Sequence, residues 1–325
     1  MEQRRLGRTD LPVSVLGFGC GAIGGLLVKG EATEQRRAIE RALDAGVSYF
    51  DTAPLYGNGA SETNLGRAFS EIGGVPDSAI IGTKVRIDPL EVSGAPTAIR
   101  LSVEASLRRL QVDRVSLIQL HTSITSERGR GVTPADVLGP ILDGFHAVRD
   151  AGLATHLGIT ANGDTDAVRE VVRSGAYASG QAMVNALNPS AGWAGHAPTG
   201  GHDFSGLIAD AITHDVGVIV IRSLAAGALA ARDDRHANAG HPGGIAGEDY
   251  DTDLARARRL ASVAEALGLD GPAELSLRLA QSTPGVGTVI VGFSDVAQLE
   301  DAIRWTARGP LATEAIARTL HAVSR

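Results

Sequence analysis

The chain has 325 residues, 43% of them hydrophobic, and a formal net charge of −7 at pH 7, which is enough apolar material for one α/β barrel or two smaller domains. Because the balance is acidic and no run of Lys or Arg exceeds a pair, the composition argues against nucleic-acid and anionic-membrane partners. The single cysteine, Cys20, excludes an intrachain disulfide and a multi-cysteine metal site.

The N-terminal residues MEQRRLGRTD lack the apolar core of a secretory signal. No apolar run reaches the roughly 18 residues that a membrane span needs. We therefore expect a soluble, cytoplasmic globular protein, and the sequence leaves its oligomeric state open.

Predicted strands and helices alternate along the chain. Apolar runs predict strands at 13–19, 48–53, 79–85, 115–121, 156–160, 181–187, 217–223 and 287–292. Amphipathic patterns predict helices at 33–45, 61–72, 97–110, 134–151, 166–174, 204–214, 254–267, 273–281 and 295–305, with Thr33 as a candidate N-cap of the first. Eight strands, each followed by a helix, predict a single (β/α)8 TIM barrel domain over residues 1–325.

A long polar stretch at 232–251, rich in Gly, His and Asp, follows the seventh predicted strand. Loops after barrel strands lie at the mouth, so we expect a mobile loop there that a ligand could order.

Four polar residues lie at or just after the ends of three predicted strands: Asp51, Tyr56, Lys84 and His121. Taken singly, the tyrosine fits a loop anchor, the lysine a solvated strand end, the aspartate a cap and the histidine an interior polar group. Because the carboxyl ends of parallel barrel strands share one mouth, we expect the four to converge. Together they suit proton transfer to a carbonyl oxygen: Lys84 would lower the pKa of Tyr56, and Asp51 would hold the lysine.

A glycine motif offers an alternative fold. The residues GCGAIG at 19–24 match the G-x-G-x-x-G pattern of Rossmann dinucleotide sites. In that fold a helix begins within the motif, but here GLLVKGEAT intervenes, and eight strand–helix units exceed the usual six strands. We therefore favour a first barrel loop whose glycines let a ligand approach the backbone.

The chain resembles the aldo-keto reductases, and its style is similar to the bacterial aldose and sugar dehydrogenase-like members. The resemblance rests on RRLGRTDLPVSVLGFG, FDTAPLYG, GTKV, LIQLH, LGIT, QAMVN and VIVGFSDVAQLEDAI. It implies a TIM barrel that binds NAD(P)H extended across its mouth. It also implies a catalytic tetrad of Asp51, Tyr56, Lys84 and His121, and a substrate wall that includes Leu55, Tyr56, His121 and Trp193.

The same resemblance implies a set of cofactor contacts. Gln181 would open the sixth strand as the nicotinamide-amide contact, and Thr160 in LGIT matches the Ser of the family's strand-five motif. Ala161 stands where the family usually has Asn, and Asn162 comes one residue later. Arg222 or Ile221 would replace the aromatic that often stacks on the nicotinamide. The full implied set is Cys20, Gly21, Asp51, Thr160, Gln181, Arg222, Ser223, Leu224, Ala226, Gly227, Gly292, Phe293, Ser294, Gln298 and Asp301.

The coenzyme could be NADP or NAD. NADP is the family default, but no Lys or Arg lies between Gly292 and Asp301, where the family usually grips the 2′-phosphate, and the first basic residue is Arg304. This moves the expectation slightly toward NAD or dual use. The nine histidines are not spaced as zinc ligands, so no metal is expected.

The predicted function is NAD(P)-dependent hydride transfer between nicotinamide and a small carbonyl or alcohol substrate, an aldehyde, ketone or sugar. The alternative from another class is a non-catalytic NADP-binding regulator that resembles the channel-associated β subunits. Measurable turnover would distinguish the two.

Overall fold

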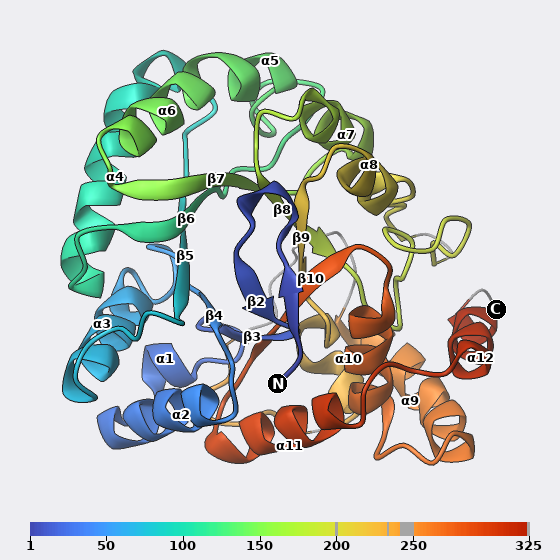
Figure 1. Ribbon diagram of the computed structural model, residues 1–325. Coiled ribbons are helices and arrows are strands. Elements are labelled where there is room, and N and C mark those ends of the chain that lie inside the picture. The colour runs from blue at the N-terminus through green and yellow to red at the C-terminus, as the bar shows by residue number, and fades with distance from the viewer. Residues whose placement is uncertain (199–200, 233, 241–249, 324–325) are drawn as a thin grey trace.

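The computed structural model describes residues 1–198, 201–232, 234–240 and 250–323. Within them, eight parallel strands close into a barrel in the order β10-β3-β4-β5-β6-β7-β8-β9 (Figure 1). Their bounds are β3 Leu16–Gly19, β4 Tyr49–Asp51, β5 Ile80–Val85, β6 Val115–Leu120, β7 Ala154–Thr160, β8 Ser179–Met183, β9 Gly217–Ile221 and β10 Val286–Gly292. The closed barrel confirms the predicted fold class and excludes the open Rossmann sheet.

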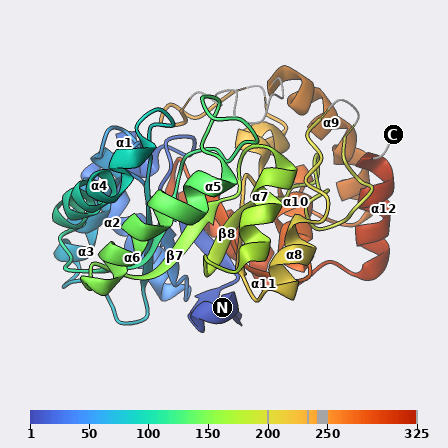
Figure 2. The same ribbon diagram turned by 90° about the horizontal axis from the view of Figure 1, so that it is seen from above.

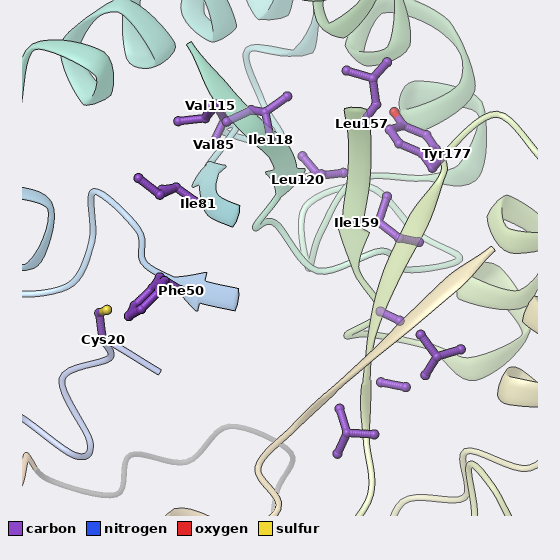
Figure 3. Close-up of a cluster of buried hydrophobic side chains, with 14 of the residues drawn as sticks. Cys20, Phe50, Ile81, Val85, Val115, Ile118, Leu120, Leu157, Ile159 and Tyr177 are labelled. Atoms are coloured by element: carbon purple, nitrogen blue, oxygen red, sulfur yellow. The ribbon is translucent and has the colours of Figure 1, made fainter. Parts of the chain in front are cut away.

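Helices surround the barrel because each has one apolar face to bury (Figures 1 and 2). In α4, for example, Ile99, Val103 and Leu110 recur on one side and are buried. Figure 3 shows part of the core that results, with Phe50, Ile118 and other strand residues among its side chains. The ring consists of α2 Ala32–Asp44, α3 Ala60–Glu71, α4 Ala95–Leu110, α6 Leu142–Asp150, α7 Thr165–Ser174, α8 Leu207–Thr213, α10 Pro272–Ser282 and α11 Val296–Ala307.

An N-terminal hairpin of β1 (Gln3–Arg5) and β2 (Pro12–Ser14) covers the amino end of the barrel (Figure 1). Leu6 and Val13 join buried side chains from several barrel strands there. The loops after the strands therefore open at the opposite end. The remaining helices are α1 Leu26–Lys29, α5 Pro134–Asp136, α9 Tyr250–Ala266 and α12 Thr313–Val323.

Three local predictions were wrong. The strand predicted at 13–19 is divided, because its first residues pair with β1 and only β3 joins the barrel. The helix predicted at 134–151 is interrupted between α5 and α6, where Gly139 leaves helical geometry (φ −109°, ψ −111°) just before Pro140. Thr33 lies inside α2, whose N-cap is Glu31.

No helix in the described ranges is both long and apolar enough to cross a membrane. The same residues contain no cluster of three or more His, Cys, Asp or Glu side chains that could hold a metal ion.

Candidate active site

The side chains of Lys84, Asp51 and Tyr56 meet at the carboxyl ends of β4 and β5. Lys84 Nζ forms an ion pair with Asp51 Oδ2, and donates to Thr52 O at 2.9 Å and to Tyr56 Oη at 3.2 Å. The Lys84 and Asp51 side chains are only 1% and 5% exposed. Since a buried charge without a partner is costly, the pair fixes the ammonium beneath the phenol.

A tight turn carries Tyr56 over the ammonium. The chain leaves β4, the Tyr56 amide donates to Ala53 O at 3.1 Å, and Gly59 at φ +90° reverses the chain into α3. His121 follows β6, and its ring meets the Tyr56 ring edge-on, with centroids 5.9 Å apart. The phenol therefore lies among an ammonium and an imidazole, with a carboxylate behind the ammonium.

Burial dominates the electrostatics of this group. Desolvation raises the pKa of Tyr56 above its usual value, and the opposing effect of Lys84 is smaller. Lys84 therefore acts in the predicted direction, but burial, which the sequence does not give, makes the net shift of the Tyr56 pKa upward, so the phenol stays protonated at neutral pH. Burial alone would lower the pKa of Lys84, but Asp51 and Tyr56 more than offset it, and the net shift is upward.

The imidazole is neutral at physiological pH. Burial, with smaller contributions from Lys84 and Arg86, lowers the pKa of His121 to about 3. A neutral imidazole still has one ring N–H to donate. It can therefore hydrogen-bond a carbonyl oxygen without adding a charge to the site.

Three donors converge on the second oxygen of Asp51. Gln181 Nε2 donates at 2.6 Å, and Gln119 Nε2 and Tyr49 Oη lie at 3.3 Å. Neither Gln119 nor Tyr49 was predicted from the sequence. One signal could have found them. Gln119 lies two residues before His121 and Tyr49 two residues before Asp51, and alternate residues of a strand share a face.

On the β7–β8 side, Thr160 and Gln181 lie side by side. Thr160 ends β7, and its hydroxyl is 3.5 Å from Gln181 Oε1. Gln181 is the third residue of β8, which starts at Ser179, so the prediction that it opens this strand was wrong. Asn162 donates instead to Ser123 Oγ at 3.1 Å and thereby ties the loop after β6 to the loop after β7.

The loop after β9 has an unusual backbone. Arg222, Ala225, Ala226 and Gly227 have positive φ values of 55°, 47°, 56° and 99°. The turns of this loop close on themselves, because the Ala225 amide donates to Arg222 O at 2.9 Å; an amide in such a turn that is not used in this way can bind an anion. In the same loop the Ser223 hydroxyl donates to Ile290 O at 3.0 Å, and Leu224 O accepts from Gly227 N.

In the segment after β10, Phe293 packs against the core and Ser294 is hydrogen-bonded to other parts of the chain. Gly292 is exposed, but Phe293 is buried against Phe18, with ring centroids 5.1 Å apart. Ser294 donates its hydroxyl to Gly24 O at 2.6 Å, and its amide donates to Gln298 Oε1 at 2.9 Å.

Charges on α11 are also paired. Asp295 caps the helix by accepting from the Gln298 amide at 2.8 Å. Asp301 pairs with Arg304, which also contacts Asp270. The basic residue nearest to this segment in sequence is therefore held by carboxylates.

In the glycine motif at 19–24, Gly19 and Gly24 lie close to the backbone of β10 and of the residue that follows it. A Cβ at Gly24 would lie 2.5 Å from the backbone of Gly292, whereas Gly21 faces the Tyr56 ring at 3.7 Å. The Cys20 amide donates to Asp51 O at 2.9 Å, and burial raises the pKa of its thiol. At Gly24, the close neighbour is therefore β10 and not a ligand.

The described part of the 232–251 stretch crosses the mouth. Arg235 donates to Ala226 O at 3.1 Å, Asn238 to Ser294 O at 3.0 Å, and the Gly240 amide to Ile23 O at 3.1 Å. Residues 233 and 241–249 lie outside the described residues. The prediction that the loop extends to 251 was wrong, because α9 begins at Tyr250.

The two apolar residues predicted to line the substrate site, Leu55 and Trp193, have different environments. Leu55 is 51% exposed beside Tyr56, whereas Trp193 packs against the hydrophobic core. A polar cavity of about 330 Å³ lies between loops that follow β6, β7 and β8. Its lining is Ser123, Thr125, Arg130, Asn162, Gly163, Asp164, His202 and Phe204.

Comparisons with known proteins agree with this architecture. The chain is 38% identical over 128 residues to "Aldo-keto reductase YhdN" of Bacillus subtilis, an alignment that covers 37% of this chain and 38% of that protein. It is 31% identical over 121 residues to "L-galactose dehydrogenase" of Arabidopsis thaliana, with 37% and 38% covered. These alignments thus span well under half of either relative.

A solved structure extends the likeness over the full chain. The holo form of aldo-keto reductase AKR11C1 from Bacillus halodurans superposes with a TM-score of 0.74 at 25% identity, covering 100% of this chain and 97% of that one. The model of the Aldo/keto reductase family matches residues 15–322. The chain therefore belongs to the aldo/keto reductase family of oxidoreductases.

Proposed function

We propose that the chain interconverts a small carbonyl compound and its alcohol with NAD(P)(H), and that Tyr56 is the general acid and base. The observation that carries the proposal is the buried Lys84–Asp51 pair with the Tyr56 hydroxyl 3.2 Å from the ammonium. When bound, the nicotinamide would supply or accept the hydride.

The chain's own residues would handle the proton and the oxygen. His121, neutral at pH 7 because its pKa is lowered to about 3, would donate its ring N–H to the carbonyl oxygen. As negative charge grows there, Tyr56 would transfer its proton, and Lys84 would stabilise the phenolate left behind. Asp51 would keep Lys84 charged and in place. In the oxidative direction the same phenolate would take the proton of the alcohol.

The cofactor contacts are part of the proposal. Thr160 and Gln181 offer a hydroxyl and an amide oxygen suited to a carboxamide. In the positive-φ run at Ala225–Gly227, the Ala225 and Gly227 amides donate to Arg222 O and Leu224 O, which leaves the Ala226 N–H as the group of this run that could face a pyrophosphate. These two features lie on neighbouring strands, as an extended dinucleotide requires.

We propose that NADH serves at least as well as NADPH. The helix after β10 begins with Asp295 and carries Asp301, and Arg304 is held by Asp270 and Asp301. A 2′-phosphate would meet carboxylates there without a free cation from α11. Fluorescence titration with each coenzyme tests this, and binding of NADPH at least tenfold tighter than NADH would reject it.

The substrate proposed is small and hydroxylated, such as a sugar. The cavity between the loops after β6, β7 and β8 is lined mainly by hydroxyl, amide and charged side chains, none of them from Asp51, Tyr56, Lys84 or His121. If a substrate held at Tyr56 extends toward these loops, such side chains suit hydroxyl groups better than an apolar skeleton. The name of the L-galactose dehydrogenase relative is consistent with this class. A panel of aldoses against matched aromatic aldehydes would test it, and a clear preference for the aromatic compounds would contradict it.

The non-catalytic regulator is the rival. Its discriminating experiment is steady-state oxidation of NADH and NADPH with aldehydes, ketones and aldoses. Turnover supports the oxidoreductase. Coenzyme binding without turnover across the panel, in either direction, would favour the regulator.

A further inference from the structure

Gln119 lies on β6 and points into the barrel directly below the candidate site. It is fully buried, and its Nε2 donates to Asp51 Oδ1 at 3.3 Å. Its Oε1 has no hydrogen-bond partner among the described residues. An amide oxygen turned toward the carboxylate would be repelled, so the orientation with N–H toward Asp51 is the favourable one.

The neighbouring strands leave room for this side chain. A Cβ at Gly82 on β5 would lie 2.4 Å from Tyr49 Oη and 3.4 Å from Gln119 Nε2. A Cβ at Gly158 on β7 would lie 3.1 Å from Gln119 Cγ. Gly158 is the register partner of Gln119. A glycine on each flanking strand thus accommodates the polar pair formed by Gln119 and Tyr49.

Two oxygens of one carboxylate have different tasks. Asp51 Oδ2 faces Lys84, while Oδ1 accepts from Gln119, Tyr49 and Gln181. Donors fixed on one oxygen prevent the carboxylate from rotating away from the ammonium. Gln181 is also a proposed cofactor contact, so Gln119 and Tyr49 are the donors dedicated to Asp51.

We propose that Gln119 is a positioning residue that acts through Asp51 to hold Lys84 charged beneath Tyr56. The proposal rests on the proposed function for its catalytic consequence. Its structural consequence, a change in how firmly Lys84 holds its proton, does not depend on turnover.

The composition of the chain makes a direct test feasible. The sequence contains only two lysines, Lys29 and Lys84, and Lys29 is exposed. In full-length protein labelled with ¹³C at lysine Cε, the two signals can be assigned with Lys29→Met and followed with pH. In Gln119→Met, which keeps side-chain length but removes the donor, we expect Lys84 to begin losing its proton at lower pH, with Lys29 unchanged.

The kinetic expectation is a fall in kcat with binding preserved. Gln119→Met should lose about tenfold in kcat, the scale of one weakened hydrogen bond to a charged group. Coenzyme affinity should stay within about twofold, because Gln119 makes no hydrogen bond to Thr160, to Gln181 or to the described part of the loop after β9, which are the proposed carboxamide and pyrophosphate contacts. In the Asp51→Asn background, Gln119→Met should lower kcat little further, because the carboxylate through which Gln119 acts on Lys84 is already absent.

Two variants separate positioning from packing. Ser179→Ala removes another fully buried polar group from the barrel interior, a hydroxyl that makes no hydrogen bond to Asp51, and should change neither readout. Gln119→Glu keeps the shape but donates only when protonated, so its kcat should fall as pH rises through the pKa of the new carboxyl. The titratable groups around the new carboxyl, which are Asp51 and its neighbours Tyr49, Lys84, Tyr56 and Cys20, are common to the wild-type reference.

Several results would overturn the proposal. They are an unchanged kcat and Lys84 titration in Gln119→Met, equal losses in Ser179→Ala, or full additivity with Asp51→Asn. Should Gln119→Met not fold, the pH dependence of Gln119→Glu decides instead. A shifted Lys84 titration in a protein whose wild type never turns over would instead defeat the proposed function, and with it the catalytic part of this proposal.

Discussion

The two sides of the barrel mouth are built differently. On the β4–β6 side, side chains form the site: Lys84 and Asp51 are buried as an ion pair, and Tyr56 and His121 stand above them. On the β9–β10 side, the proposed cofactor site is formed by backbone, through left-handed residues at Ala225 and Ala226 and the capped start of α11. Proton chemistry needs particular functional groups, whereas a cradle for a dinucleotide needs N–H groups that any residue except proline can supply.

The largest expected effect falls on the side-chain half. Lys84→Met should reduce kcat by at least about 10²-fold, because the phenolate formed by Tyr56 loses its charge partner. It should also cost about 3 kcal/mol of unfolding free energy, since Asp51 remains buried without a cation. Steady-state kinetics and denaturant unfolding measure both. Lys29→Met, at an exposed position, is the matched control and should change neither quantity. A fully active Lys84→Met would contradict the proposed catalytic role of Lys84.

The same ion pair predicts how folding stability changes with pH. The folded-state pKa of Lys84 is raised above 10.5, so the pair's contribution to stability is complete below the unfolded-state pKa and is lost as pH rises through the folded-state value. In the lysine-labelled protein, Lys84 should titrate above the ordinary lysine pKa. Titration of Lys84 below that value would show that burial outweighs Asp51.

A smaller effect is expected at the start of α11. Asp295→Ser keeps a good N-cap while removing a carboxylate. NADPH affinity should improve by about threefold to tenfold relative to NADH, because one repulsive charge is removed. Titration with both coenzymes measures the ratio. Asp113→Ser makes the same charge change just before β6, at the amino end of the barrel, and should leave the ratio unaltered; an unaltered ratio in Asp295→Ser would place the adenosine end elsewhere.

The smallest effect should come from the strained backbone. Ala226→Gly relieves a φ of +56° and should raise stability by at most about 1 kcal/mol. Coenzyme affinity should change by less than about threefold, since the backbone N–H groups remain. Ala228→Gly, at a buried position in the same 3-10 turn without a positive φ, should instead destabilise the protein. A large loss of coenzyme binding in Ala226→Gly would show that the methyl group itself matters.

The same contrast explains what could be predicted from sequence. Periodicity gave the eight strands, and the chemistry of FDTAPLYG and GTKV identified side chains that do lie together. The left-handed conformation of Ala225 and Ala226 could not be predicted from the sequence, because Ala does not favour positive φ. The break at Gly139 was marked in the sequence by Pro140, whereas the division of 13–19 depends on pairing with β1. The net pKa shift of Tyr56 depends on burial that a sequence does not give.

The most direct test of the central claim is Tyr56→Phe, compared with wild type in kcat and in coenzyme affinity. The substitution removes one hydroxyl and leaves the ring beside Gly21 and His121. We expect kcat to fall by about 10²-fold or more, the usual scale of a lost general acid, with coenzyme affinity within about twofold of wild type. Turnover at the wild-type rate in Tyr56→Phe would contradict the proposal that Tyr56 moves the proton.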